Sequence, residues 1–334
     1  MIYRPNREKD VERLKELARS MIAATGHEEI SLSSLSSSDY SQLEELITFL
    51  IDECGKKKIN ISLPSLRIDA FSLDIMQKVQ DIKKSSLTFA PEAGSQRLRN
   101  VINKGLTIDN ILDGSKQAFE GGWNKVKLYF MLGLPTETEE DMRAIPELAN
   151  EIAALYYDTV PKEKRNGKCQ ITISTSFFVP KPFTPFQWAT MLDPGDYLGR
   201  AKIVNDHVKE QLNHKSIRYN WHEADVTVLE GVLARGDRKL SDAIEYVYTH
   251  GGLFDAWSDF FNYDLWLEAF AACNIDIDFY TKRVRSDDEI FPWDFIDVGV
   301  TREFLLREWK TALTETVTPN CRMRCSGCGA RQYG

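Results

Sequence analysis

Short runs of β-prone residues alternate with amphipathic helical patterns along most of the first two thirds of the chain. The strands are predicted at residues 29–35, 59–63, 87–90, 126–132 and 170–180. The helices with the clearest boundaries are predicted at residues 10–24, 40–54, 71–82 and 196–212. A strand and helix recurring every 25 to 35 residues or so is typical of a parallel β-α barrel.

The predicted fold class is therefore α/β, an incomplete (β/α)6 barrel with a mainly helical C-terminal extension. No strand is predicted before the helix at 10–24, although a complete barrel opens with a strand. Three segments are expected: the barrel at 1–215, a mainly helical accessory region at 216–312 that opens with an extended stretch, and a cysteine-rich tail at 313–334.

Charge and hydropathy exclude some classes of function. The 334 residues include 42 basic and 50 acidic side chains, a net charge of −8, so the chain has no electrostatic footprint for generic nucleic-acid binding. No apolar run reaches membrane-spanning length, and residues 1–10 contain no signal-peptide core. A cytoplasmic protein without a membrane partner is expected.

Residues able to contact a ligand follow two of the predicted strands. Glu92 follows the strand at 87–90, where its carboxylate could bind an ammonium group or hydroxyls, or could instead cap the next helix. Gly133, Leu134 and Pro135 follow the strand at 126–132, where glycine leaves room for a flat base and proline stiffens the turn. The acids at 139–141 are explained by a helix N-terminus.

Three motifs carry a family resemblance: FAPEAGSQRLR at 89–99, LYFMLGLPTET at 128–138 and FFVPKPFTPFQW at 177–188. They resemble strands four, five and six of radical S-adenosylmethionine (SAM) enzymes. The resemblance is strongest to the cobalamin-binding radical SAM proteins and extends to the radical SAM methylthiotransferases. A later run at 235–261 resembles the accessory region of the cobalamin-associated group.

This resemblance implies a set of SAM-binding residues. Glu92 and Ser95 would contact the amino-acid moiety or ribose, and Arg99 would hold the carboxylate. A solvated helix face explains Arg99 equally well. Contacts to the adenine are implied for Gly133, Leu134, Pro135 and the backbone of Phe178 and Val179. No catalytic residue is assigned.

The resemblance also bears on the start of the chain. In the cobalamin-associated group, a run like MIYRP at 1–5 directly follows the Cys-x-x-x-Cys-x-x-Cys loop that binds the catalytic [4Fe-4S] cluster. We therefore expect the chain to begin just after its own cluster loop. An upstream cobalamin domain is implied as well. By this interpretation the chain is a fragment that is inactive because it lacks its cluster ligands.

Cys321, Cys325 and Cys328 repeat the Cys-x-x-x-Cys-x-x-Cys spacing in the tail. Too few residues follow for a barrel, so these thiols are not expected to hold the radical SAM cluster. An auxiliary metal site is predicted, either an open-faced iron-sulfur cluster or a zinc ion with water or another residue as the fourth ligand.

The main functional hypothesis is a radical SAM enzyme, with cobalamin-associated methyl or methylthio transfer to an unidentified substrate such as RNA or protein. The alternative is a non-catalytic α/β protein whose cysteine tail binds metal and docks a partner or RNA. Iron with sulfide absorbance would favour the enzyme, and stoichiometric zinc without SAM binding would favour the docking protein.

Overall fold

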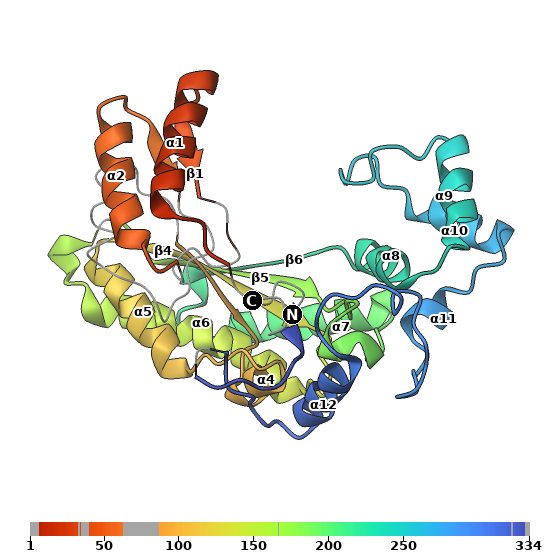
Figure 1. Cartoon of the computed structure of the whole chain (residues 1–334). Helices are drawn as coiled ribbons and strands as arrows, with labels where there is room; N and C mark the ends of the chain where they lie inside the picture. Colours follow the sequence, from red (N-terminus) through yellow and green to blue (C-terminus); the bar gives the residue numbers. More distant parts are fainter. Residues whose placement is uncertain are drawn as a thin grey trace.

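The computed structural model describes residues 7–32, 34, 40–62, 87–165, 167–321 and 323–330 (Figure 1). The helix predicted at 71–82 lies outside these residues. The same holds for the MIYRP run and for the ends of the strands predicted at 29–35 and 59–63.

The described elements follow the predicted alternation of strands and helices. The strands are β1 (Glu29–Ser31), β2 (Asn60–Ser62), β3 (Leu87–Glu92), β4 (Lys125–Leu132), β5 (Gln170–Phe177) and β6 (Ile217–Trp221). The helices are α1 (Val11–Thr25), α2 (Leu43–Gly55), α4 (Gln96–Val101), α5 (Ile108–Glu120), α6 (Glu139–Thr159), α7 (Pro194–Glu210), α8 (Ala224–Arg235), α9 (Leu240–Thr249), α10 (Tyr263–Ala272), α11 (Ile277–Thr281) and α12 (Arg302–Leu313). A short 3-10 turn, η4 (Pro185–Trp188), follows β5.

All paired strands in the described residues are parallel, which confirms the predicted α/β class. One sheet has the order β3-β4-β5-β6, and β1 pairs with β2 in a second, two-stranded sheet. Strand β6 lies beyond the barrel boundary predicted at residue 215 and pairs with β5, so the sheet extends into the region assigned to the accessory segment.

The larger sheet owes its burial to alternation along the strands. In β4, Val126, Leu128, Phe130 and Leu132 are buried on one face, while the residues between them are more exposed. Helices α5, α6 and α7 run along this sheet (Figure 1), and their apolar residues complete its core. The period-2 pattern therefore gives the sheet one apolar face, which the helices cover, and one more polar face.

Two helical regions stand apart from this core. Helices α1 and α2 pack on β1 and β2 in a cluster of their own, and α8 to α11 form another (Figure 1). The mainly helical C-terminal extension is confirmed. Its last helix, α12, returns to pack against α4 and η4. No helix within the described ranges is both long and apolar enough to cross a membrane.

Candidate functional site

The carboxyl ends of β3, β4 and β5 meet at one edge of the sheet. Glu92 pairs in register with Phe130, and Leu132 pairs with Phe177. The ladder continues past β5, because the backbone N–H of Phe178 donates a 2.8 Å hydrogen bond to the carbonyl of Leu132. The three sequence motifs that follow these strands are thereby brought to the same edge, where parallel sheets bind ligands.

Glu92 has a backbone conformation that is uncommon for a residue with a side chain. Its φ is +69°, at the point where the register between β3 and β4 shifts. Such a conformation costs roughly 1–2 kcal/mol and is concentrated at functional sites. The carboxylate is 27% exposed and forms a 3.0 Å ion pair with Nζ of Lys104. Glu92 does not cap α4, because Ser95 is the N-cap residue.

Ser95 and Gly94 serve the packing of the turn after β3. The Ser95 hydroxyl oxygen accepts a 3.0 Å bond from the N–H of Leu98 and donates to Asp141 of α6. A Cβ at Gly94 would lie 2.5 Å from the backbone nitrogen of Ile145. Glycine is therefore required for close approach to α6, and the hydroxyl of Ser95, expected at the ligand, already has two protein partners.

Arg99 has a different environment from the one expected for a SAM-binding residue. Its side chain has no exposed surface. The guanidinium donates to the carbonyls of Ala93, Gly94 and Leu106 at 2.8–3.1 Å. Burial lowers the pKa of Arg99 to about 10. In this arrangement Arg99 holds the turn between β3 and α4, and neither the expected ligand contact nor a solvated helix face fits it.

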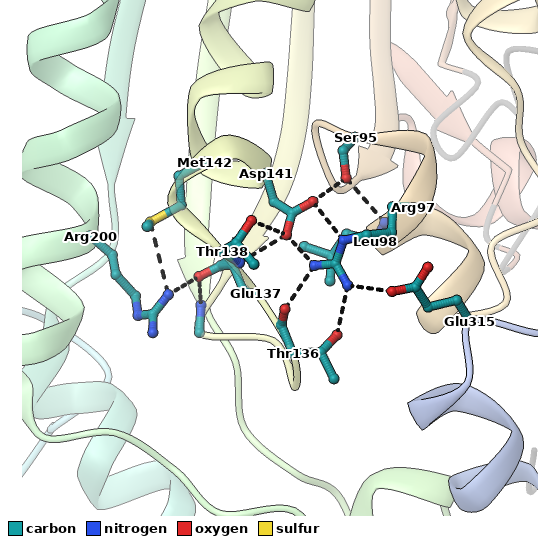
Figure 2. A network of polar contacts seen from close by, with 11 residues as sticks. Ser95, Arg97, Leu98, Thr136, Glu137, Thr138, Asp141, Met142, Arg200 and Glu315 are labelled. Atoms are coloured by element: carbon teal, nitrogen blue, oxygen red, sulfur yellow. Dashed lines mark hydrogen bonds and ion pairs between the residues drawn. The ribbon is translucent and has the colours of Figure 1, made fainter.

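Arg97 and Asp141 form the centre of the polar network in Figure 2. The Arg97 guanidinium pairs with the buried Asp141 carboxylate and donates a 2.7 Å bond to the carbonyl of Thr136. Burial favours a higher pKa for Asp141, but bonds from Arg97, Ser95 and Thr138 outweigh it, so the pKa lies below its ordinary value. The backbone N–H of Thr138 donates to Asp141 at 2.8 Å, which confirms the helix-start explanation for the acids at 139–141.

Glu137 is a second buried acid beside this network, which sequence reasoning missed. Its side chain is 1% exposed and accepts a 2.8 Å bond from the N–H of Gly133 and a 2.6 Å bond from Arg200 (Figure 2). Burial raises its pKa from 4.5 to about 7 in spite of these two bonds. The signal available in the sequence was an acid four residues after a strand-end glycine.

Gly133 itself is required by both backbone and space. Its φ is +83°, and an added Cβ would lie 2.6 Å from Cε1 of Tyr197. The neighbouring Leu134 is buried, and Pro135 is half-buried. The turn after β4 is therefore closely packed, and the space that was expected to accept a flat base beside Gly133 is occupied by Tyr197 of α7.

Helix α12 covers part of this edge. Leu134 and Phe178 lie in one apolar cluster with Ala312, and Trp309 packs against it. Phe186 of η4 connects them through edge-to-face contacts, at 5.7 Å between ring centroids, with both Phe178 and Trp309. Trp309 of α12 and Phe186 of η4 thus pack against residues that were expected to contact the adenine.

The backbone of Phe178 is already hydrogen-bonded inside the protein. Its N–H donates to Leu132, and its carbonyl accepts a 2.8 Å bond from the hydroxyl of Tyr197. Val179 is buried. The Phe178 N–H is therefore already used within the sheet, and its carbonyl has one lone pair left for a further hydrogen bond.

The tail cysteines lie within the described residues but are not gathered at one point. Cys321 and Cys325 are exposed and Cys328 is partly buried. Among the residues that the structure describes, no group of three or more His, Cys, Asp or Glu side chains is close enough to hold a metal ion. The predicted metal site remains a prediction.

Comparison with known proteins identifies the first part of the chain. Residues 1–149 match the family model named Radical SAM superfamily. The chain contains a radical SAM domain. This finding confirms the resemblance at the level of the superfamily, and it includes the motifs at the ends of β3 and β4.

Two proteins of Methanocaldococcus jannaschii have sequences similar to this chain. An uncharacterized protein is 34% identical over 245 residues, which is 73% of this chain and 50% of that protein. A provisionally named methylthiotransferase is 30% identical over 97 residues, 29% of this chain and 21% of that protein. The chain thus spans half or less of each relative. Among solved structures, one match is the Elp3 protein of Methanocaldococcus infernus with an N-terminal deletion. The match covers 73% of this chain and 64% of the Elp3 chain, with 10% sequence identity and a TM-score of 0.41.

A radical SAM domain implies SAM and a [4Fe-4S] cluster as cofactors. The residues of this chain fit SAM better than they fit the cluster. Cys54 is the one cysteine in the sequence from 1 to 149. It is fully buried in the α1 and α2 cluster, and burial raises the pKa of its thiol. These matched residues do not provide three cluster ligands. For SAM, the partly exposed carboxylate of Glu92 fits, whereas Ser95, Arg99 and Phe178 are engaged elsewhere.

Proposed function

We propose that this chain provides the SAM-binding edge of a radical SAM enzyme that transfers a methyl or methylthio group. The observation that carries the proposal is the meeting of the β3, β4 and β5 carboxyl ends at one edge, where β3 and β4 lie in the radical SAM domain. Parallel α/β folds bind ligands at this position because strand ends fix the loops and leave backbone groups free.

Within this edge we assign Glu92 as the residue that contacts SAM. Its carboxylate is partly exposed. Its backbone has a strained, positive φ, a feature that is concentrated at functional sites. Ser95 and Arg99 act as positioning residues for the turn that carries Glu92, through their bonds to Asp141 and to backbone carbonyls. Gly133, Leu134 and Pro135 form the apolar side of the edge.

The proposed reaction class goes beyond what this chain holds. Methylthio transfer is supported by the similarity to the provisionally named methylthiotransferase, over 97 residues. Association with cobalamin is supported by the motif resemblance alone, and RNA or protein is proposed as the substrate. We assign no SAM-cleavage step to residues of this chain, because the matched domain does not provide three cluster ligands. The chain alone is expected to bind SAM without cleaving it.

Calorimetric titration of the chain with SAM tests the binding proposal. Wild-type protein is expected to bind, and Glu92→Gln is expected to weaken binding about tenfold through loss of a charge-assisted contact. Glu139→Gln is the matched control, since its side chain is 53% exposed and pairs only along α6 with Arg143. Absence of SAM binding, or equal affinity of Glu92→Gln and wild type, would contradict the proposal.

A separate assay tests the expected inactivity. The anaerobically reduced chain, reconstituted with iron and sulfide, is assayed for 5′-deoxyadenosine. No product above background is expected. Robust formation of 5′-deoxyadenosine would show that ligands outside residues 1–149 support cleavage.

The second candidate is a non-catalytic protein whose tail binds metal and docks a partner or RNA. The presence of one buried cysteine in the matched radical SAM domain favours it. A chain that binds zinc stoichiometrically and does not bind SAM would support this function and reject the first.

A further inference from the structure

The cysteine tail is held against the same edge of the sheet by contacts at both of its ends. On the N-terminal side, Oε1 of Glu315 accepts a 2.9 Å bond from Arg97, and the N–H of Thr318 donates a 3.2 Å bond to Oδ1 of Asn103. Arg97 lies in α4, and Asn103 follows Ile102, the C-cap residue of that helix. This end of the tail is therefore attached to the segment that follows β3.

On the C-terminal side, the tail is attached to the N-terminal end of α12. The carbonyl of Cys328 accepts a 2.9 Å bond from the N–H of Thr301. Ala330 is 2% exposed and belongs to a cluster with Trp188 of η4 and Phe304 of α12. Since η4 follows β5, this apolar cluster also connects the tail to a segment that leaves the carboxyl edge.

Between these points, described residues on the two sides of position 322 bond to one another. The carbonyl of Asn320 accepts bonds of 3.1 Å from the N–H groups of Met323 and Arg324. The hydroxyl of Ser326 donates to the carbonyl of Pro319 at 3.2 Å. This loop, residues 319–328, contains all three cysteines of the motif.

We propose that residues 319–328 are a metal-binding loop in which the thiolates of Cys321, Cys325 and Cys328 hold one thiophilic metal centre at the carboxyl edge of the sheet. Three thiolates within eight residues suit zinc or an iron-sulfur cluster, which both prefer sulfur ligands. The proposal does not rest on SAM binding, because none of the contacts that carry it involves Glu92.

Attachment at both ends reduces the cost of closing the loop around a metal. A short segment with fixed ends has few conformations to lose, so the three thiols can converge at modest entropic cost. Gly327, with φ of +68°, precedes Cys328 and permits a sharp turn there. Convergence is needed because the described thiols do not form a metal-ready group.

The remaining cysteines are poorly suited to compete for the metal. Cys54 and Cys169 are buried, and burial raises the pKa of the Cys169 thiol to about 12. Cys273 is partly exposed but follows α10, in a different cluster of the fold. A metal titration should therefore report on the tail.

The test is an anaerobic titration of the reduced full chain with Co²⁺ as a zinc probe and, separately, with Fe²⁺ and sulfide. We expect one metal centre per chain with thiolate-to-metal charge-transfer absorbance in one arm, and the arm that responds distinguishes zinc from iron-sulfur. Cys325→Ser should abolish this absorbance, and Cys273→Ser should retain it. No charge-transfer band in either arm, or an unchanged band in Cys325→Ser, would overturn the proposal.

A second variant tests the attachment. Asn103→Gly removes the acceptor of the Thr318 N–H while tolerating the φ of +51° at this position. We expect metal affinity to fall about two- to tenfold, as for loss of one hydrogen bond, with the charge-transfer band intact at saturation. Metal should also protect residues 319–328 from proteolysis. Unchanged affinity in Asn103→Gly, or no protection by metal, would reject a loop held at the edge.

Discussion

The backbone N–H of Gly133 donates a 2.8 Å hydrogen bond to Oε2 of Glu137, across the turn that ends β4. Burial raises the pKa of Glu137 from 4.5 to about 7. The folded protein therefore binds this proton more tightly than the unfolded chain does. The stabilising effect of protonation is complete below about pH 4.5 and is lost as the pH rises to about 7.

Glu137→Gln is expected to remove this pH dependence. Over that range the free energy of unfolding of the wild type should fall relative to the variant by on the order of 3 kcal/mol. Urea unfolding at a series of pH values measures the difference. Glu139→Gln, at an exposed position in α6, should follow the wild-type curve. Parallel curves for wild type and Glu137→Gln would show that Glu137 titrates normally.

Gly133→Ala should destabilise the fold through two effects. The φ of +83° strains any residue with a Cβ, and that Cβ would lie 2.6 Å from the Tyr197 ring. We expect a loss of about 2–4 kcal/mol in the free energy of unfolding. Gly26→Ala is the matched control, because Gly26 has φ of +64° and nothing within 4 Å of its Cβ position. Equal losses in the two variants would exclude a contribution from Tyr197.

Glu92→Gly should separate stability from ligand binding. Glycine relieves the backbone strain at φ of +69°, so the free energy of unfolding should rise by about 1 kcal/mol. The ion pair with Lys104 is partly exposed and offsets little of this gain. SAM affinity should fall at the same time. If stability and affinity both fall, Glu92 is a structural residue rather than a ligand contact.

Arg97→Ala leaves the Asp141 carboxylate buried without its ion-pair partner. We expect a loss of roughly 2–4 kcal/mol in the free energy of unfolding. The double variant Arg97→Ala/Asp141→Asn should recover part of this loss, because the unpaired charge is gone. Glu315→Gln, on the more exposed side of Arg97, should cost less than about 1 kcal/mol. A double variant no more stable than Arg97→Ala would contradict this account.

Local pattern was sufficient for the α/β class and for the strands that reach the candidate site. Alternation in residues 126–132 predicted β4, and the glycine at 133 marked its end. The acids at 139–141 were correctly explained as the start of a helix, because capping depends on residues three or four positions apart. These features are local in sequence, and so the sequence displays them.

The roles of Arg99 and Gly94 could not be predicted in the same way. An arginine near a strand end suits a carboxylate ligand and suits backbone carbonyls equally well, and only the packed turn decides between them. Gly94 faces the backbone of α6, which lies some fifty residues later in the chain. The cover formed by Trp309 over Phe178 depends on a helix that is still farther away.

The contacts of α12 and of the residues that follow it also bear on how the chain folds. Arg97 and Glu315 are 218 residues apart in sequence, and Asn103 and Thr318 are 215 apart. Contacts between residues so far apart in sequence form late, because the entropy of closing a long loop must be lost before these contacts stabilise the fold. During synthesis the apolar edge around Leu134 and Phe178 stays uncovered until the ribosome has released α12. The nascent chain therefore depends on α12 to cover an apolar surface that residues much earlier in the sequence form.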